Sequence, residues 1–315
     1  MAGSKKIAFL FPGQGSQAVG MGRAFAQASP EARARFAAAD AALGVGLTRL
    51  CFEGPLDQLT RTANAQPAVL TVSVVAAEAL AAAGVRPDLV AGHSLGEYSA
   101  LVAAGALEFA DAVHTVRARG TFMQESVPEG QGGMAAILGA PAAAVRQACA
   151  EVEREGHGVV EVANLNAPDQ TVISGTAAAV ARAMALCEGR GAKRAVRLQV
   201  SAPFHCRLLQ PAAARLAEAL RGVGVRPPRI PVVRNVDAEP MTDPAEVIPG
   251  LVRQVCAPVL WEPSVRRLVK EGVEVFIEVG PGRVLAGLVK RIVSGAAVYA
   301  VEDPGGVRAV CGALA

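Results

Sequence analysis

Short, mainly apolar runs recur along the chain, separated by longer segments with a helical pattern. The runs at residues 7–11, 89–91 and 275–279 are rich in branched or aromatic side chains, and glycine or proline follows each of them directly. Such runs predict buried strands of a parallel sheet. Their alternation with helices predicts an α/β fold, in which a hydrolase-like large domain is built on a parallel central sheet.

The remaining elements of the large domain follow from the same patterns. Helices are predicted over residues 31–43, 67–83, 109–123, 208–220, 245–256 and 263–270, and from Gly282 to 292, and strands over 230–235 and 298–302. Pro67 is expected in the first turn of its helix, where proline fits because that turn needs no N–H donor.

The pattern changes between residues 130 and 200. Strands are predicted at 134–138, 159–164, 171–174 and 195–200, and helices at 141–154 and 176–188. This βαββαβ order is that of a ferredoxin-like unit. Loops at 129–133 and 201–203 suit crossings between domains. We therefore predict a large domain of residues 1–129 and 201–315, with a ferredoxin-like insertion domain of residues 130–200.

Composition narrows the class of protein. Of the 315 residues 52% are hydrophobic and 19% are charged, which is typical of a compact globular chain. The net charge of +3 is spread without a basic run, so we expect no nucleic-acid partner. The six cysteines form no C-x-x-C pair and have no metal-ligand spacing, so we expect no metal site and a reducing, cytoplasmic location.

Two apolar segments bear on membranes. The run at 7–11 is cut by Pro12 and is too short for a signal-peptide core. The longer segment at 67–84 is rich in alanine and interrupted by Ser73 and Glu78, which favours a buried helix over a membrane span. We therefore expect no membrane partner.

One stretch carries the strongest chemical signal. An apolar run reaches Gly92 and a helix-forming run starts at Leu95, so Ser94 falls at the corner of a G-x-S-x-G sequence. Gly92 and Gly96 lack the side chains that would collide in so tight a turn. The N–H of Leu95 lies at a helix start, free to donate to an anion forming beside Ser94. A chance match is the alternative, and the strand before and helix after favour a nucleophile elbow.

A serine nucleophile needs a base, and the chain has four histidines. His114 lies within a predicted helix and is interpreted as a half-buried structural residue. His157, between two glycines in a turn of the insertion, is interpreted as a surface residue. His93 precedes Ser94 and points to the opposite face of its strand. That leaves His205, where the chain returns from the insertion and a cleft is expected.

A second loop is expected near the same edge of the sheet. Gln14 lies between Gly13 and Gly15 just after the first strand, where loops of parallel sheets line a binding crevice. Its backbone N–H can approach a ligand closely. An ordinary surface turn is the alternative, and a phosphate loop is disfavoured because neither G-K-[ST] nor G-x-G-x-x-G spacing is present.

Several separated motifs lie at residues 11–17, 62–68, 92–97, 117–124, 164–166, 204–205, 254–258 and 278–282. With these motifs nearly the whole chain resembles the malonyl-CoA:acyl carrier protein transacylases, the freestanding acyltransferases of bacterial fatty acid synthesis. It is similar also to the acyltransferase domains of polyketide synthases. The function this resemblance implies is transfer of malonyl from malonyl-CoA to the phosphopantetheine thiol of an acyl carrier protein, by a ping-pong mechanism.

The resemblance also implies roles for individual residues. Ser94 is the nucleophile that carries the malonyl ester, and His205 is its base. The backbone N–H groups of Gln14 and Leu95 form the oxyanion hole. A main-chain carbonyl at Gln254 orients the histidine, where most serine hydrolases use a carboxylate.

Substrate contacts are implied in the same way. Arg119 grips the malonyl carboxylate with two parallel donors, whereas Arg117 is structural. His93 and Phe204 are expected to line the substrate site. Phenylalanine before the catalytic histidine is common in polyketide-type acyltransferases, while many freestanding enzymes carry serine there, so the pathway of the carrier protein stays open.

Two other functions are possible for such an elbow. A serine esterase or thioesterase could use the same elbow, but the usual order places an acidic residue between the serine and a late histidine, and Arg119 would have no purpose for neutral esters. A non-catalytic scaffold conflicts with an intact serine and histidine. No tightly bound cofactor is expected, and the acyl carrier protein is expected as a transient partner.

Overall fold

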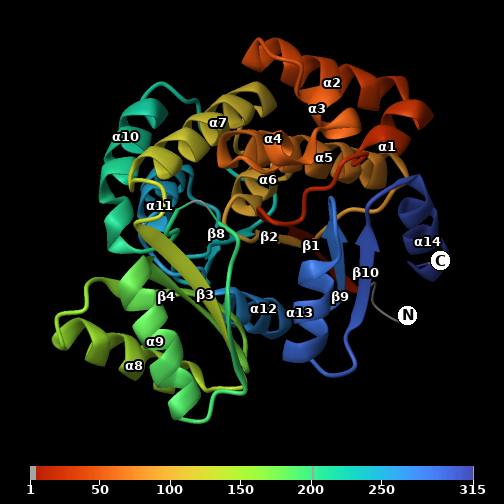
Figure 1. Ribbon diagram of the computed structural model, residues 1–315. Helices are drawn as coiled ribbons and strands as arrows, with labels where there is room; N and C mark the ends of the chain where they lie inside the picture. The colour runs from red at the N-terminus through yellow and green to blue at the C-terminus, as the bar shows by residue number, and fades with distance from the viewer. Residues whose placement is uncertain (1–4, 201, 315) are drawn as a thin grey trace.

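A mostly parallel sheet forms the centre of the molecule (Figure 1). The structure is a computed structural model that describes residues 5–200 and 202–314. The six strands of the sheet, in spatial order, are β10 (Ala297–Val301), β9 (Val273–Val279), β1 (Lys6–Phe11), β2 (Leu89–Gly92), β7 (Val232–Val233) and β8 (Pro240–Met241). All neighbouring pairs are parallel except β7 with β8. The predicted α/β fold with a parallel central sheet is confirmed.

Alternate side chains of β1 enter two different cores. Phe9 and Phe11 pack in the larger core on one face, whereas Ala8 and Leu10 pack in a second core on the other. A strand that is buried on both faces reads as a continuous apolar run, which is why residues 7–11 show no polar alternation. Both faces of the sheet are therefore covered by helices.

The helices fall into two groups around the sheet, above and below it in Figure 1. Those above are α1 (Arg23–Ala28), α2 (Pro30–Leu43), α3 (Leu47–Glu53), α4 (Leu56–Thr60), α5 (Thr62–Ala82), α6 (Gly96–Ala103) and α7 (Phe109–Glu125). Helices α12 (Trp261–Lys270) and α13 (Val284–Ile292) lie below. The chain also forms α10 (Gln210–Leu220), α11 (Val247–Gln254), α14 (Pro304–Leu314) and two short 3-10 helices, Arg207–Leu209 and Pro244–Glu246.

The central helix α5 corrects one prediction. It begins at Thr62, so Pro67 lies inside the helix and not in its first turn. The N–H groups of Asn64 and Ala65 already bond to the carbonyl of Arg61, so the helix is established before the proline is reached. Among the described residues α5 is the one helix long and apolar enough to cross a membrane, and 78% of its most apolar window is buried inside the protein. This burial agrees with the predicted core helix.

Several other boundaries differ from the sequence prediction. The strand expected at 230–235 is reduced to Val232–Val233, and the antiparallel edge strand β8 beside it was not predicted. The short helices α1, α3 and α4 and the last helix α14 were also missed. Helices of five to seven residues have too few turns to show an apolar periodicity.

The ferredoxin-like unit has its own antiparallel sheet, at the lower left of Figure 1. Its strands, in spatial order, are β4 (Val160–Ala167), β5 (Gln170–Thr176), β3 (Gly132–Leu138) and β6 (Arg194–Arg197). Helices α8 (Ala142–Arg154) and α9 (Ala177–Gly189) pack on it and close a separate core. The predicted βαββαβ order is confirmed, with β6 ending earlier than expected.

This smaller sheet joins the large domain through the strand β4. The N–H of Leu165 donates to the carbonyl of Val259 at 2.9 Å, and the N–H of Val259 donates to the carbonyl of Ala163 at 2.9 Å. The domain boundaries at 129/130 and 200/201 stay predictions, and Ser201 lies outside the described residues. The bonds bring β4 alongside the end of the parallel sheet that carries Ser94.

Candidate active site

Ser94 lies in a sharp turn between β2, which ends at Gly92, and α6, which begins at Gly96. Its backbone has φ 52°, in the left-handed region that non-glycine residues rarely adopt. A Cβ on Gly92 would lie 1.9 Å from the backbone carbon of Gly96, and one on Gly96 would lie 2.0 Å from the carbonyl oxygen of Phe11. Both glycines are therefore required for the chain to turn here, as the sequence pattern predicted.

His205 lies where the chain returns from the insertion to the large domain, and its ring contacts this serine. The two atoms Ser94 Oγ and His205 Nε2 are 2.7 Å apart. On the opposite side of the ring, Nδ1 lies 2.9 Å from the main-chain carbonyl oxygen of Gln254. A carbonyl oxygen only accepts, so Nδ1 carries the proton and Nε2 offers its lone pair to the serine hydroxyl. The serine hydroxyl thus has a histidine as its proton acceptor, and a main-chain carbonyl, not a carboxylate, orients that histidine.

The ring of His205 is almost completely buried, with 4% of its surface exposed. Burial, together with the nearby charge of Arg119, lowers its pKa to about 3. The imidazole is therefore neutral at ordinary pH and ready to accept a proton. Its backbone, like that of the serine, is in the left-handed region, with φ 61°.

Of the other three histidines, one lies near Ser94 without bonding to its hydroxyl, and two lie at the surface. His93 Nε2 lies 2.9 Å from Oδ1 of Asn166, and its ring packs 5.6 Å from Trp261. His157 is exposed at the surface, as predicted. His114 is exposed too, which corrects the expectation of a half-buried residue, since it lies on the polar face of α7 between buried neighbours.

Arg119 projects from α7 into the same place and is 1% exposed. Its Nη2 donates to Ser94 Oγ at 3.0 Å and to Oε1 of Gln254 at 2.9 Å, while Nη1 donates to Oε1 of Gln66 at 2.8 Å. The Nε atom is buried with no hydrogen-bond partner among the described residues. A buried guanidinium directed at the nucleophile can hold an anionic substrate there. Arg117, by contrast, is bonded to Asn64.

These side chains line one cavity of about 340 Å³. Its walls include Gln14, Ser94, Leu95, Arg119, Phe204 and His205, together with His93. The first main-chain hydrogen bond of the elbow turn is donated by the N–H of Gly96, to the carbonyl of His93 at 2.9 Å. The N–H of Leu95 comes one residue earlier and takes no part in the hydrogen bonds of the turn. Within residues 5–200 and 202–314, no group of three or more His, Cys, Asp or Glu side chains is placed to hold a metal ion.

Sequence reasoning missed a set of buried polar residues beneath the elbow. Asn235 receives the N–H of Ser94 on its Oδ1 at 2.7 Å and donates from Nδ2 to the carbonyl of Gly92 at 2.6 Å. Glu97 Oε2 receives the N–H of Asn235 at 2.9 Å and an Nε2 hydrogen of Gln254 at 3.0 Å. A signal was present, because Glu97 is the single charged residue in the otherwise apolar helix α6.

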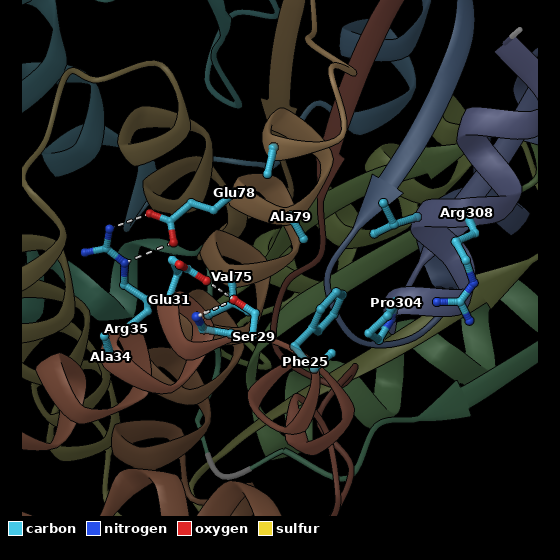
Figure 2. Close-up of a pocket in the computed structure, with 14 residues that line it drawn as sticks. Phe25, Ser29, Glu31, Ala34, Arg35, Val75, Glu78, Ala79, Pro304 and Arg308 are labelled. Atoms are coloured by element: carbon cyan, nitrogen blue, oxygen red, sulfur yellow. Dashed lines mark hydrogen bonds and ion pairs between the residues drawn. The ribbon is translucent and has the colours of Figure 1, made fainter.

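A larger cavity, of about 760 Å³, lies between α1, α2, α5 and α14 (Figure 2). Figure 2 shows two pairs among its polar side chains, Arg35 with Glu78 and Ser29 with Glu31. The described lining contains no histidine or cysteine, and its one hydroxyl, that of Ser29, caps α2. The smaller cavity therefore holds the chemistry, although the larger has more room.

Comparisons with known proteins identify relatives of this chain. Residues 8–305 match the family model described as "Acyl transferase domain". The chain is 52% identical over 299 residues to the malonyl CoA-acyl carrier protein transacylase of Bacillus subtilis (strain 168), covering 95% of this chain and 94% of that one. The corresponding protein of Escherichia coli (strain K12) is 48% identical, with 96% and 98% covered.

Solved structures give the same likeness. The malonyl CoA-acyl carrier protein transacylase of Coxiella burnetii superposes with a TM-score of 0.96 at 40% identity, covering 99% of this chain and 98% of that one. A malonyl-transacylase in complex with its type II polyketide synthase acyl-carrier protein superposes with a TM-score of 0.95 at 43% identity, with 98% and 99% covered.

Proposed function

The chain belongs to the acyl transferase family, and we propose that it works through a malonyl ester on Ser94. It moves the malonyl group of malonyl-CoA to the phosphopantetheine thiol of an acyl carrier protein. One observation carries the proposed route, namely that Ser94 Oγ lies within hydrogen-bond distance of both His205 Nε2 and Arg119 Nη2. The nucleophilic oxygen thus lies next to both a base and a cation that can bind a carboxylate.

The first half-reaction starts from the neutral histidine. His205 Nε2 takes the proton of the Ser94 hydroxyl as Oγ bonds to the thioester carbon. The tetrahedral anion then collapses, the carbon–sulfur bond breaks, and the coenzyme A sulfur leaves with the proton returned by the histidine. A thiolate needs little help to leave, so a weakly basic histidine held by a carbonyl, without a carboxylate, suffices.

The anion formed on the way needs donors. We assign this role to the backbone N–H groups of Gln14 and Leu95, two residues that line the cavity with Ser94. Donors of this kind stabilise a tetrahedral anion by about 2.7–4 kcal/mol each. Gln14 is supported from its side chain, whose Nε2 donates to Thr62 Oγ1 at 3.2 Å.

Arg119 supplies the selectivity for malonyl. Its charge is buried, and the malonyl carboxylate can take the place of one of the neutral acceptors that it holds in the free enzyme. An acetyl group offers no such partner. His93 and Phe204, which line the same cavity, are assigned to the walls that hold the acyl chain.

The second half-reaction reverses the first. The thiol of the carrier's phosphopantetheine gives its proton to His205 and attacks the ester carbon, and Ser94 leaves with that proton. We propose that the carrier docks at the groove between the large domain and the insertion, near Lys193, Arg194 and Arg197, which are all exposed. Positive side chains there suit the acidic surface expected of such a partner.

Location and pathway complete the proposal. All six cysteines are free thiols, which suits a cytoplasmic enzyme. The serine, the histidine and the thioester supply every group the two half-reactions use, so we propose that no resident cofactor takes part. We propose fatty acid synthesis as the pathway. Purified carriers from fatty acid and polyketide synthesis, compared as acceptors, test that choice.

Intact-protein mass spectrometry after mixing with malonyl-CoA tests the route. We expect a stable mass gain of one malonyl group on the parent, its loss to an added carrier protein, and no gain on Ser94→Ala. Rapid release of free malonate without a carrier would instead support a serine esterase or thioesterase. Malonyl uptake by Ser94→Ala at the normal rate would exclude the proposed nucleophile.

A further inference from the structure

A single carboxylate oxygen ties together the segments that surround the nucleophile. Glu97 lies three residues after Ser94 and is 3% exposed. Its Oε2 receives the N–H of Asn235, from the segment after β7, and a side-chain hydrogen of Gln254, at the end of α11. These two partners are fully buried and lie 138 and 157 residues away in the chain.

The first partner fixes the elbow. Asn235 uses its side chain to hold the N–H of Ser94 at 2.7 Å and the carbonyl of Gly92 at 2.6 Å. Ser94 is in a strained left-handed conformation that persists only where its surroundings determine it. Because Glu97 holds the main chain of Asn235, it fixes the group that pins the strained serine.

The second partner fixes the arginine. Gln254 directs its Nε2 at two oxygens that accept, Oε2 of Glu97 and the carbonyl of Ser94, both at 3.0 Å. Its Oε1 faces Nη2 of Arg119, and a guanidinium only donates. The amide can satisfy all these groups in one orientation alone. The carboxylate of Glu97, together with the carbonyl of Ser94, therefore helps to turn the amide oxygen of Gln254 toward Arg119.

We propose that Glu97 is a positioning residue for the reaction assigned to Ser94, and that its carboxylate holds Asn235 and sets the orientation of the Gln254 amide. The inference rests on the proposed function. Once Glu97 is protonated, its bonds from Asn235 and Gln254 lose their charge assistance, although a carboxyl oxygen can still accept. The hold on Asn235 and on the Gln254 amide is then weaker.

Protonation falls in a range that can be measured. Burial raises the pKa of Glu97 to about 7, against the bonds from Asn235 and Gln254 and the charge of Arg119, which lower it. Asp237 opposes ionisation through its own charge, and the neighbouring Tyr98 hydroxyl is neutral in this range because burial raises its pKa further above its ordinary value. His205, with a pKa of about 3, is neutral throughout.

The test is the pH dependence of loading by the full-length protein, with malonyl-pantetheine as donor because it has no phosphate to titrate. We expect kcat/KM of the parent to fall below about pH 7, by roughly tenfold in all, and to level off at the rate of the neutral variant. Glu97→Gln should be slower than the parent by roughly tenfold at pH 8, since charge-assisted bonds become neutral ones. Its profile should be flat between pH 5.5 and 8.

Glu278→Gln is the matched control. Glu278 is also fully buried, accepts two backbone N–H groups, from Leu285 and Ala286, and has its pKa raised by burial to about 7. It does not contact the elbow residues. This variant should lose thermal stability yet keep the acid limb of the parent, which separates positioning from general support of the fold.

Three results would overturn the inference. They are a parent profile without an acid limb between pH 5.5 and 8, an acid limb that persists in Glu97→Gln, or one that disappears in Glu278→Gln. If Glu97→Gln does not fold, Glu97→Asp decides, because it keeps a carboxylate and must keep the limb at a lower rate. Loading by Ser94→Ala, measured in parallel, would instead refute the proposed function itself.

Discussion

Nη2 of Arg119 lies 3.0 Å from Oγ of Ser94 and 2.9 Å from Oε1 of Gln254, so both hydrogens on that nitrogen are in use. A carboxylate gripped by the two terminal nitrogens of the guanidinium must displace one of these acceptors. If it displaces the serine, Oγ keeps His205 as its partner. Binding of an acidic acyl group would then release the nucleophile from the arginine as it brings the thioester close.

Arg119→Ala should lower the rate of malonyl loading by one to a few powers of ten, because charge-assisted bonds of about 1.5–3 kcal/mol are lost. Acetyl loading should hold steady or rise. In the parent, acetyl leaves the buried guanidinium without an anionic partner, and the variant has no guanidinium to leave unpaired. Arg119→Lys should recover part of the malonyl activity, because a point charge cannot reproduce the planar fork. The measurement is the ratio of second-order loading rates for malonyl-CoA and acetyl-CoA.

Arg117→Ala is the natural comparison on the same helix. Arg117 is half-buried and bonds to Asn64, outside the cavity that holds Ser94. Its loss should leave the ratio of the two loading rates unchanged. If Arg119→Ala kept the parent ratio and Arg117→Ala altered it, Arg117 and not Arg119 would bind the malonyl carboxylate, and our assignment would be wrong.

His205→Ala should slow loading by orders of magnitude and also change the acid sensitivity of the fold. The folded pKa of His205, about 3, lies below the ordinary value of 6.5, so between these values the unfolded chain binds the extra proton. Keeping the ring neutral therefore contributes stability that is present above about pH 6.5 and lost as pH falls toward 3. The loss is on the order of 5 kcal/mol.

Urea unfolding of the parent and of His205→Ala at several pH values between 7 and 4 measures this difference. The free energy of unfolding of the variant should fall less steeply with acid than that of the parent. Parallel curves would show that the histidine is not held neutral by burial.

Gly96→Ala should destabilise the protein by more than about 3 kcal/mol, because its Cβ would lie 2.0 Å from the carbonyl oxygen of Phe11. Gly287→Ala in α13 is the matched control. No atom lies within 4 Å of its added Cβ, so alanine should stabilise that helix by roughly 0.5–1 kcal/mol. The free energy of unfolding, measured for both, tests the packing of the elbow. A tolerated Gly96→Ala would mean that the turn is looser than described.

Charge reversal at Lys193, Arg194 and Arg197 should raise KM for the carrier protein several-fold and leave malonyl loading intact. The difference from the parent should shrink as salt is added, because exposed charges are screened. Arg308→Glu, on the exposed surface of α14 far from the insertion in Figure 1, is the control and should not change KM. An unchanged KM in the triple variant would show that these three residues are ordinary solvated surface residues and do not dock the carrier.

The local pattern of the chain was sufficient for the elbow. Ser94 could be placed from its flanking glycines and the strand and helix on either side, and His205 was the remaining histidine at a domain junction. The role of Arg119 came from the resemblance alone, because an arginine within a helix is most often solvated. The structure places it 1% exposed against the serine.

The polar support beneath the elbow could not be predicted in the same way. Asn235 and Glu97 are 138 residues apart in the chain, and no spacing rule joins them. Residues 230–235 are predicted as one strand, but only Val232–Val233 form it, so the pattern gives no sign that Asn235 turns toward the elbow. Pro67 shows the limit of a local rule for helix starts, because the helix begins at Thr62 and is already established when the proline is reached.

The left-handed backbone at both Ser94 and His205 has a consequence for protein engineering. Each such residue costs about 1–3 kcal/mol relative to a relaxed conformation, and glycine would avoid that cost. A screen of variants for heat resistance alone would therefore favour glycine at both positions and recover robust but inert proteins. Thermostable forms of this chain have to be sought with these two residues held fixed.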